Sequence, residues 1–214
     1  MDDVLISAGL QLLLFLASAG FILYLISKMS FVVRFIASNK KNSWGLVILA
    51  IVLGVLIILS SKYGFDVNGA KINVRDSIAI FSAVVGGPIV GIFVSIVGAA
   101  YRLYIGGWTA IPCSLATLFA GLIAVLFVYY KKVTPANINS RQIWSFILFA
   151  GLWEIIHLLI FVPLLGAKPL VEGFNIMVTQ FVVPMMIFNM ILLAVFLLIM
   201  KDSIQTYIKL KKLR

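Results

Sequence analysis

Long apolar runs fill most of this chain, and short polar stretches separate them. A helix needs about 20 apolar residues to cross the hydrocarbon core of a bilayer. Five runs satisfy this requirement easily. They are residues 5–27, 44–61, 108–130, 143–165 and 174–200. The pattern predicts an all-α integral membrane protein that folds as a single polytopic helical bundle.

The stretch 76–105 is apolar as well, but it is predicted to break. As one helix it would measure about 45 Å, whereas the hydrocarbon core is about 30 Å thick. Gly86, Gly87 and Pro88 stand in its middle. Proline removes a backbone donor and clashes with the preceding turn, and glycine has little helix propensity. We therefore predict a short helix over 76–85 and a longer one over 88–105, for a total of about seven membrane segments, six of them full-length.

Composition excludes a soluble domain. Hydrophobic residues make up 63% of the 214 residues and charged residues only 11%, against about 25% charged residues in a typical soluble domain. The net charge of +10 could indicate nucleic acid. The Lys and Arg residues, however, lie in short clusters between apolar runs, where lipid headgroups and the positive-inside rule account for them. The lipid bilayer is the expected partner, and nucleic acid is not.

The basic clusters predict the orientation. Seven crossings place three of them on one side of the membrane, whereas six crossings would export the first cluster, which lies in a short loop where the rule is strongest. We predict a multi-pass protein of the plasma membrane with its amino terminus outside and its carboxyl terminus in the cytoplasm. The clusters are Lys28, Arg34, Lys40 and Lys41; Lys131, Lys132 and Arg141; and Lys201, Lys209, Lys211, Lys212 and Arg214.

Seven segments would bring two arginines, a thiol and two hydroxyls to one depth on the outer side: Arg75, Arg102, Cys113, Ser114 and Thr117. A guanidinium fork matches a carboxylate with two parallel hydrogen bonds. This set predicts a pocket for a small organic anion. In the alternative interpretation, both arginines extend to lipid headgroups.

A second polar cluster is expected on the last two spans. Glu154 and His157 lie one helical turn apart near mid-membrane, where ionisable groups are costly and usually functional. They form either a proton-linked or ligand-contacting pair, or a mutually satisfied hydrogen bond, with Gln180 or Asn189 as further partners. No metal or other cofactor is predicted, because no second His or Cys stands at ligand spacing from His157.

Pro184 and Asn189 interrupt the last span. A proline there can kink the helix. We predict a hinge at Pro184, deeper in the membrane than the ligand site, that passes a change into residues 202–214. The same pattern also fits a kinked helix without a signalling role. No phosphate-binding loop, zinc-protease motif, nucleophile elbow or kinase ATP site is present, so we predict that this chain is not an enzyme.

Several motifs resemble the membrane sensor domain of LytS-type receptors, the input domain of bacterial LytS/YehU-like sensor histidine kinases that also precedes diguanylate cyclases. The resemblance covers about residues 61–200. The motifs are Asn73-Val-Arg-Asp76, Gly86-Gly-Pro-Ile-Val-Gly91, Tyr101-Arg-Leu-Tyr-Ile-Gly-Gly107, Trp108-Thr-Ala-Ile-Pro-Cys113, Ala120-Gly121 and Pro184-Met-Met-Ile-Phe-Asn189.

The resemblance implies a ligand-sensing input domain of a homodimeric receptor. Its output domain, a histidine kinase or a diguanylate cyclase, would lie outside these residues and act on a cytosolic response regulator. The expected division is 1–43 for the first helix and a cytosolic loop, 44–200 for the sensor domain and 201–214 for the start of a signalling helix.

Some members of this family sense extracellular pyruvate through two arginines and a cysteine that match Arg75, Arg102 and Cys113. A hydroxyl residue about one turn beyond the cysteine also contributes there. Here that position is Ala116, and Ser114 and Thr117 are the nearby hydroxyls, which leaves open which small acid binds. The Gly-Gly-Pro short helix is also similar to the substrate-binding S-components of vitamin transporters. A membrane subunit of a small-molecule transporter is therefore the alternative function.

Overall fold

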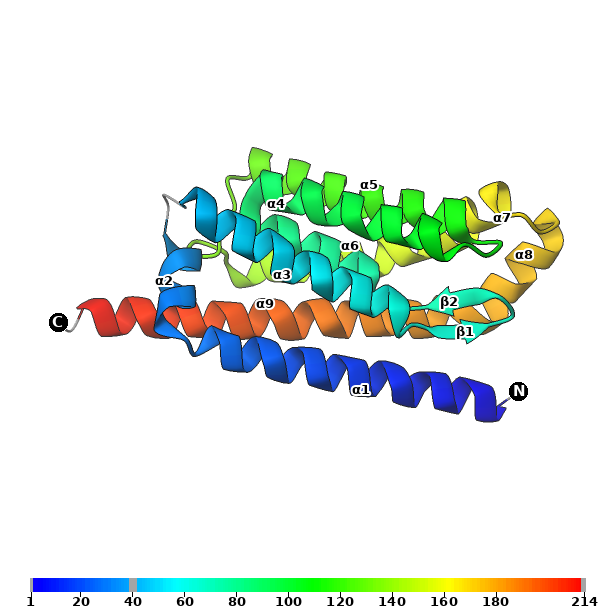
Figure 1. Cartoon of the computed structure of the whole chain (residues 1–214), viewed down its shortest axis with the longest axis horizontal. Helices are drawn as coiled ribbons and strands as arrows, with labels where there is room; N and C mark the ends of the chain where they lie inside the picture. Colours follow the sequence, from blue (N-terminus) through cyan, green and yellow to red (C-terminus); the bar gives the residue numbers. More distant parts are fainter. Residues whose placement is uncertain (1, 39–41, 213–214) are drawn as a thin grey trace.

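The computed structural model describes residues 2–38 and 42–212, and shows helices packed side by side along one long axis (Figure 1). Within these residues, six helical segments are long and apolar enough to cross a membrane, which agrees with the predicted all-α membrane bundle. Lys40, Lys41 and Arg214 of the predicted basic clusters lie outside the described residues. The helices are α1 (Asp2–Ser27), α2 (Ser30–Ala37), α3 (Ser43–Lys62), α4 (Arg75–Ile105), α5 (Ala110–Tyr130), α6 (Ser140–Ile156), α7 (Val162–Leu165), α8 (Leu170–Ile176) and α9 (Val182–Lys212).

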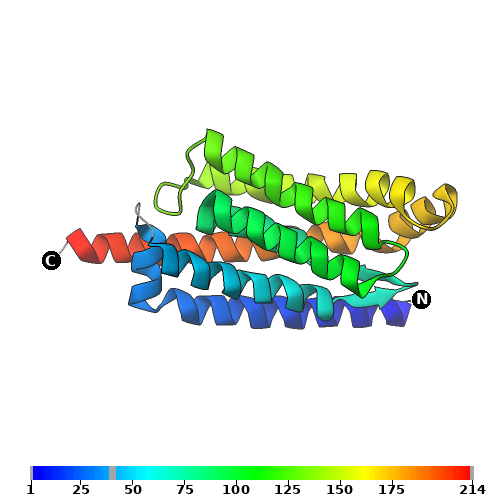
Figure 2. The same ribbon diagram turned by 45° about the horizontal axis from the view of Figure 1, so that its top comes forward.

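Two further elements were not predicted. The first is a β-hairpin of β1 (Phe65–Val67) and β2 (Ala70–Ile72), joined by Asn68 and Gly69, both with positive φ. An Asn-Gly pair is the preferred sequence of such a tight turn. The second is a pair of π-helical turns, η1 (His157–Phe161) and η2 (Met177–Phe181). We call the end of the bundle with β1, β2 and α8 the hairpin end, and the end with α2 and the carboxyl terminus the opposite end (Figure 2).

Local sequence explains where several helices begin and end. The Asn42 side chain accepts a hydrogen bond from the Gly45 N–H at the start of α3. Asn139 and Gln142 form a reciprocal capping box at the start of α6, which satisfies two donors that the helix itself leaves open. Gly106, with φ 77°, ends α4 in a conformation that only glycine adopts readily.

Helix α4 reverses direction at Gly87, as the predicted break at residues 86–88 requires. Gly87 has φ 76° and ψ −169°, outside the helical region. A Cβ built on Gly91 would stand 2.8 Å from the Ala83 Cα, although residues eight apart in a straight helix are separated by about 12 Å. The two halves, 75–86 and 88–105, therefore run antiparallel.

The first half of α4 is buried along its whole length. It is about six residues shorter than the second half, a difference of roughly 9 Å in length. Because both halves meet at Gly87, the first half begins below the hairpin end, inside the bundle. Arg75, its first residue, is thereby placed among other helices rather than at the surface.

The last two spans each contain a π-helical turn shortly before a proline. Pro163 follows η1 and Pro184 follows η2. A proline ring clashes with the carbonyl four residues earlier, and a wider turn is one way for a helix to absorb that conflict. The helix interruption predicted at Pro184 is therefore the π-helical turn η2.

The predicted depth of Pro184 is wrong. Asn189 is hydrogen-bonded to Ser77 in the first turn of α4, and α9 runs from the hairpin end to the opposite end (Figure 1). Pro184 lies five residues earlier in α9, about 7.5 Å nearer the hairpin end. It is therefore not deeper in the bundle than Arg75, because the register of α9 against α4 places Asn189 at that level.

Small residues let α4 and α5 approach closely. A Cβ on Gly121 of α5 would stand only 1.7 Å from the Ser95 Oγ and 2.8 Å from the Ser95 Cβ. By contrast, a Cβ on Gly54 of α3 would meet its nearest neighbour, the Phe93 ring, at an ordinary 3.8 Å. The contact between α4 and α5 therefore depends on the missing side chain at Gly121.

Gly121→Ala is expected to destabilise the protein by about 1–3 kcal/mol, since overpacking at this contact must outweigh the gain in helix propensity. Gly54→Ala is the matched control and should be neutral or slightly stabilising. Thermal unfolding of both variants in detergent measures the difference. An unfolding temperature for Gly121→Ala at or above that of wild type would contradict the packing described.

Candidate functional site

Arg75 is enclosed by uncharged hydrogen-bond acceptors. Its side chain is 0% exposed. The guanidinium donates from Nε to the Thr117 Oγ1 at 2.6 Å, from Nη1 to the Ser61 Oγ at 3.3 Å and from Nη2 to the Cys113 carbonyl oxygen at 3.3 Å. Its backbone N–H is held by the Asn73 side chain. Helices α3, α4 and α5 thus converge on this guanidinium.

Arg102 lies in the last turn of α4 and is 1% exposed. Its guanidinium donates to the Gly106 carbonyl oxygen and, at 2.7 Å, to the Thr109 Oγ1. Its Nε has no hydrogen-bond partner among the described residues. Both acceptors come from the loop that joins α4 to α5.

Neither guanidinium forms a direct ion pair with a carboxylate of the described residues, although Arg75 interacts electrostatically with Asp76. Within the part of the chain that the structure describes, the carboxylates that form ion pairs do so with Lys28, Lys168 and His157. The structure places both arginines inside the bundle rather than at its lipid-facing surface. A buried charge is costly unless it is paired, so this arrangement can take up an anion.

Cys113 and Ser114 lie in the first turn of α5, beside the arginines. The Cys113 thiol is free and buried, and it interacts electrostatically with both guanidiniums and with His157. The Ser114 hydroxyl donates to the Ala110 carbonyl of its own helix at 2.7 Å. Of the two hydroxyls expected near the site, it is Thr117 that contacts an arginine.

Thr117 connects Arg75 to a buried acidic group that sequence reasoning missed. The Thr117 Oγ1 lies 2.6 Å from the Asp76 Oδ1. The other oxygen of that carboxylate, Oδ2, lies 3.4 Å from the His157 Nδ1, which is itself 3.2 Å from the Glu154 Oε2. These donor groups of Asp76, Glu154 and His157 lie within 4.8 Å of one another.

The four residues expected to form the second polar cluster are divided between three places. Glu154 and His157 contact each other and Asp76. Gln180 accepts a hydrogen bond from Asn68 of the hairpin, in an exposed position. Asn189 lies apart from both the Glu154–His157 pair and Gln180.

Asn189 instead joins α9 to the start of α4. Its Oδ1 accepts from the Ser77 N–H at 3.1 Å, and its Nδ2 donates to the Asn73 carbonyl at 3.2 Å. The Ser77 hydroxyl donates to the Asn189 carbonyl at 2.7 Å. The first N–H groups of a helix have no partner within the helix, so Asn189 satisfies a donor that would otherwise be unpaired next to Arg75.

Trp108 ties together the segments that cover the hairpin end of the site. Its indole N–H donates to the Asn68 carbonyl at 3.0 Å, and its backbone carbonyl accepts from the Ala167 N–H at 3.0 Å. A Cβ on Gly173 would stand 3.6 Å from its ring. Trp108 belongs to the same loop as the two acceptors of Arg102, so movement of that loop would affect both the arginine and its cover.

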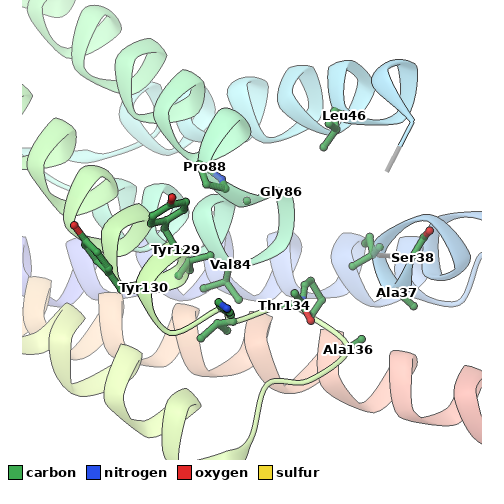
Figure 3. Close-up of a pocket in the computed structure, with 16 residues that line it drawn as sticks. Ala37, Ser38, Leu46, Val84, Gly86, Pro88, Tyr129, Tyr130, Thr134 and Ala136 are labelled. Atoms are coloured by element: carbon green, nitrogen blue, oxygen red, sulfur yellow. The ribbon is translucent and has the colours of Figure 1, made fainter. Parts of the chain in front are cut away.

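A cavity of about 700 Å³ lies elsewhere, at the opposite end (Figure 3). It is lined by the turn at Gly86 and Pro88, the carboxyl end of α2, the last residues of α5, which include Tyr129 and Tyr130, and the residues that follow α5. Lys132 is its only charged lining residue among those described. This cavity is therefore separate from the arginine pair and has no comparable set of donors for an acid.

Comparison with known proteins adds independent information. A family model described as the 5TMR of 5TMR-LYT matches residues 29–203. Sensor histidine kinase BtsS of Escherichia coli is 25% identical over 155 residues, which are 72% of this chain and 27% of the relative. Sensor protein LytS of Staphylococcus saprophyticus is 27% identical over 183 residues, covering 78% of this chain and 29% of the relative. No solved structure matches the chain.

The match extends over most of the chain, from just after α1 into α9. The chain spans less than a third of the length of the two relatives named, so it corresponds to their membrane part. Its apolar helices agree with that assignment. This chain therefore belongs to the 5TMR-LYT family, the multi-pass membrane sensor domains of LytS-type receptors.

Proposed function

We propose that this chain is the input domain of a sensor histidine kinase and binds a small extracellular organic acid, such as pyruvate, between Arg75 and Arg102. The observation that carries the proposal is that two fully buried guanidiniums have only uncharged acceptors. A carboxylate would supply the directly bonded negative charge that neither guanidinium has among the described residues. The family supports a sensory role, since the relatives are named sensor histidine kinases or sensor proteins.

The energetics of a small ligand favour this kind of site. A two- or three-carbon acid has little apolar area, so hydrophobic burial gives it little affinity. Charge-assisted hydrogen bonds contribute roughly 1.5–3 kcal/mol each. In the proposed complex the arginines hold the carboxylate, and Cys113 with Thr117 or Ser114 contacts the other end of the ligand. The contact of Thr117 with Arg75 favours Thr117 over Ser114 for that role.

The proposed signal passes from α4 to α9. A ligand that binds Arg75 acts on the first turn of α4, and Asn189 of α9 is hydrogen-bonded to that turn. Helix α9 continues to Lys212 at the opposite end. To shift an equilibrium, the ligand must bind two conformations with different affinity. In the complete receptor we propose a homodimer in which α9 leads to a cytosolic kinase that acts on a response regulator.

We further propose that the hairpin end faces the outside of the cell. Lys28, Lys131, Lys132 and Lys201 gather at the opposite end, where Lys28 pairs with Asp202 and Lys201 donates to Ser140. The positive-inside rule assigns such an end to the cytoplasm.

Cysteine labelling tests the orientation. Lys62→Cys and Ala167→Cys, both exposed at the hairpin end, should react with a membrane-impermeant maleimide in intact cells. Lys131→Cys and Lys209→Cys should react only after permeabilisation. Wild type is the control, since its Cys113 is buried. The opposite labelling pattern would reverse the orientation, and labelling of both ends from one side would contradict the spanning bundle.

Arginine substitutions test the ligand site. Arg75→Ala and Arg102→Ala should each weaken the binding of pyruvate or a related short acid by about tenfold to a few hundredfold, as expected for one lost charge-assisted contact. Arg102→Lys should also weaken it, because lysine keeps the charge but loses the planar fork. Calorimetry on the purified protein in detergent measures these affinities.

Arg141→Ala, which removes an exposed arginine at the opposite end, is the matched control and should bind as wild type does. If wild type binds an acid and the Arg75 and Arg102 variants bind it equally well, the ligand lies elsewhere. If wild type binds none of the short acids tested, this class of ligand is wrong.

Trp108 should report on ligand entry. Because both arginines are enclosed, we propose that a ligand reaches them by movement of the loop that carries Trp108. Titration with an acid that binds should therefore change the intrinsic fluorescence of wild type. Trp144 is 63% exposed, so Trp144→Phe is the control and should show the same change. Trp108→Phe should lose most of the change while calorimetry still detects binding. An unaltered fluorescence change in that variant would exclude this route.

A further inference from the structure

One imidazole nitrogen faces two buried carboxylates in the middle of the bundle. The His157 Nδ1 lies 3.4 Å from the Asp76 Oδ2 and 3.2 Å from the Glu154 Oε2. A ring nitrogen carries at most one hydrogen, and charge-assisted N–H···O bonds are usually about 2.7–2.9 Å long. Nδ1 therefore cannot satisfy both carboxylates, and both distances are long for such a bond.

The carboxylates also keep unpaired oxygens. The Asp76 Oδ2 and the Glu154 Oε1 have no hydrogen-bond partner among the described residues. The Asp76 side chain is 3% exposed and the Glu154 side chain 1%. No lysine or arginine nitrogen of the described chain lies within 4 Å of either group. His157 and, through the electrostatic interaction with Asp76, Arg75 are the positive groups near these carboxylates. Because a buried carboxylate oxygen without a hydrogen bond is costly, the two unpaired oxygens leave room for a bound cation.

The spacing of the donor atoms fits a small metal ion. Tetrahedral zinc has bonds of about 2.0–2.2 Å to nitrogen and oxygen, which place neighbouring donor atoms roughly 3.3–3.5 Å apart. The 3.2 and 3.4 Å separations here are close to that value. An organic ammonium group, with N···O distances of about 2.8 Å, would hold its acceptors roughly 4.6 Å apart. The two distances from the imidazole nitrogen therefore fit a metal ion better than an organic cation, and all three donor atoms lie within 4.8 Å of one another.

The surrounding structure orients these donors. Asp76 comes from α4, Glu154 from α6 and His157 from the first position of η1. The Thr117 hydroxyl lies against the Asp76 Oδ1 at 2.6 Å and leaves Oδ2 directed toward the imidazole. Hydrogen bonds of this kind to a ligating carboxylate are typical of metal sites, and π-helical turns are frequent at functional sites.

We propose that Asp76, Glu154 and His157 bind one divalent transition-metal ion of the Zn²⁺ type. Two carboxylates and a neutral imidazole compensate its charge fully. One nitrogen and two oxygens suit Zn²⁺, Co²⁺ or Fe²⁺, whereas Mg²⁺ and Ca²⁺ take six or more oxygen ligands. This site does not depend on the proposed acid site, but the two share Thr117, which contacts both Asp76 and Arg75.

Metal binding to the purified chain tests the proposal without any organic acid. The protein is prepared in detergent with a histidine-free tag, treated with chelator and loaded with Zn²⁺, and its metal content is determined by mass spectrometry after buffer exchange. We expect one Zn²⁺ per chain. Titration with Co²⁺ should give the visible absorption bands of a low-symmetry, four- or five-coordinate ion.

Glu154→Gln and Asp76→Asn keep the shape of the side chain but remove a charged ligand. Each should weaken Zn²⁺ binding by more than about tenfold, because even the loss of a residue that only hydrogen-bonds to a metal ligand usually has an effect of that size. Glu172→Gln, at an exposed carboxylate of α8, is the matched control and should bind as wild type does. Size-exclusion chromatography checks that the variants fold.

Two results would overturn the proposal. In the first, wild type retains no stoichiometric Zn²⁺ and shows no Co²⁺ bands, in which case the cluster holds only a proton. In the second, folded Glu154→Gln and Asp76→Asn bind Zn²⁺ as tightly as wild type. Neither result bears on the arginine pair, which the calorimetry tests separately.

Discussion

A helix that begins inside a membrane bundle must find partners for its open backbone donors within the protein. Lipid offers none, and an unsatisfied group there costs several kcal/mol. The first half of α4 starts in this way at Arg75, because it is too short to reach the hairpin end. Asn73 holds the Arg75 N–H, and Asn189 holds the Ser77 N–H. The recessed helix start, the buried guanidinium beside it and the link to α9 all follow from this constraint.

Several of the buried polar groups of the described residues cluster at this helix start. Arg75, Asp76 and Ser77 are consecutive residues, and each side chain contacts a different set of helices. Arg75 contacts α5 and α3, Asp76 contacts α5 and η1, and Ser77 contacts α9. One turn of helix therefore contacts the arginine environment, the acidic cluster and the last span. Displacement of that turn would be felt by all three.

The sequence predicted the features that depend on neighbouring residues. Membrane spans follow from runs of apolar residues, and the reversal of α4 follows from Gly86, Gly87 and Pro88. The tight turn of the hairpin had the same kind of local signal, Asn68-Gly69, but a prediction based on long apolar runs did not use it. Features that depend on the register between distant helices were not accessible. Asp76 meets Glu154 across 78 positions of sequence, and the pairing of Asn189 with Ser77 rather than His157 depends on how far α9 is displaced along α4.

The Thr117 hydroxyl lies between two charged groups and has a single hydrogen. Two acceptors compete for that hydrogen: the Asp76 Oδ1 at 2.6 Å and the Cys113 carbonyl at 3.0 Å. The oxygen meanwhile accepts from the Arg75 Nε. If the charge on Asp76 changes, rotation of one O–H bond redistributes the lone pairs that the guanidinium meets, and no backbone atom has to move. Information between the acidic cluster and the arginine can therefore travel as a reorientation of a dipole.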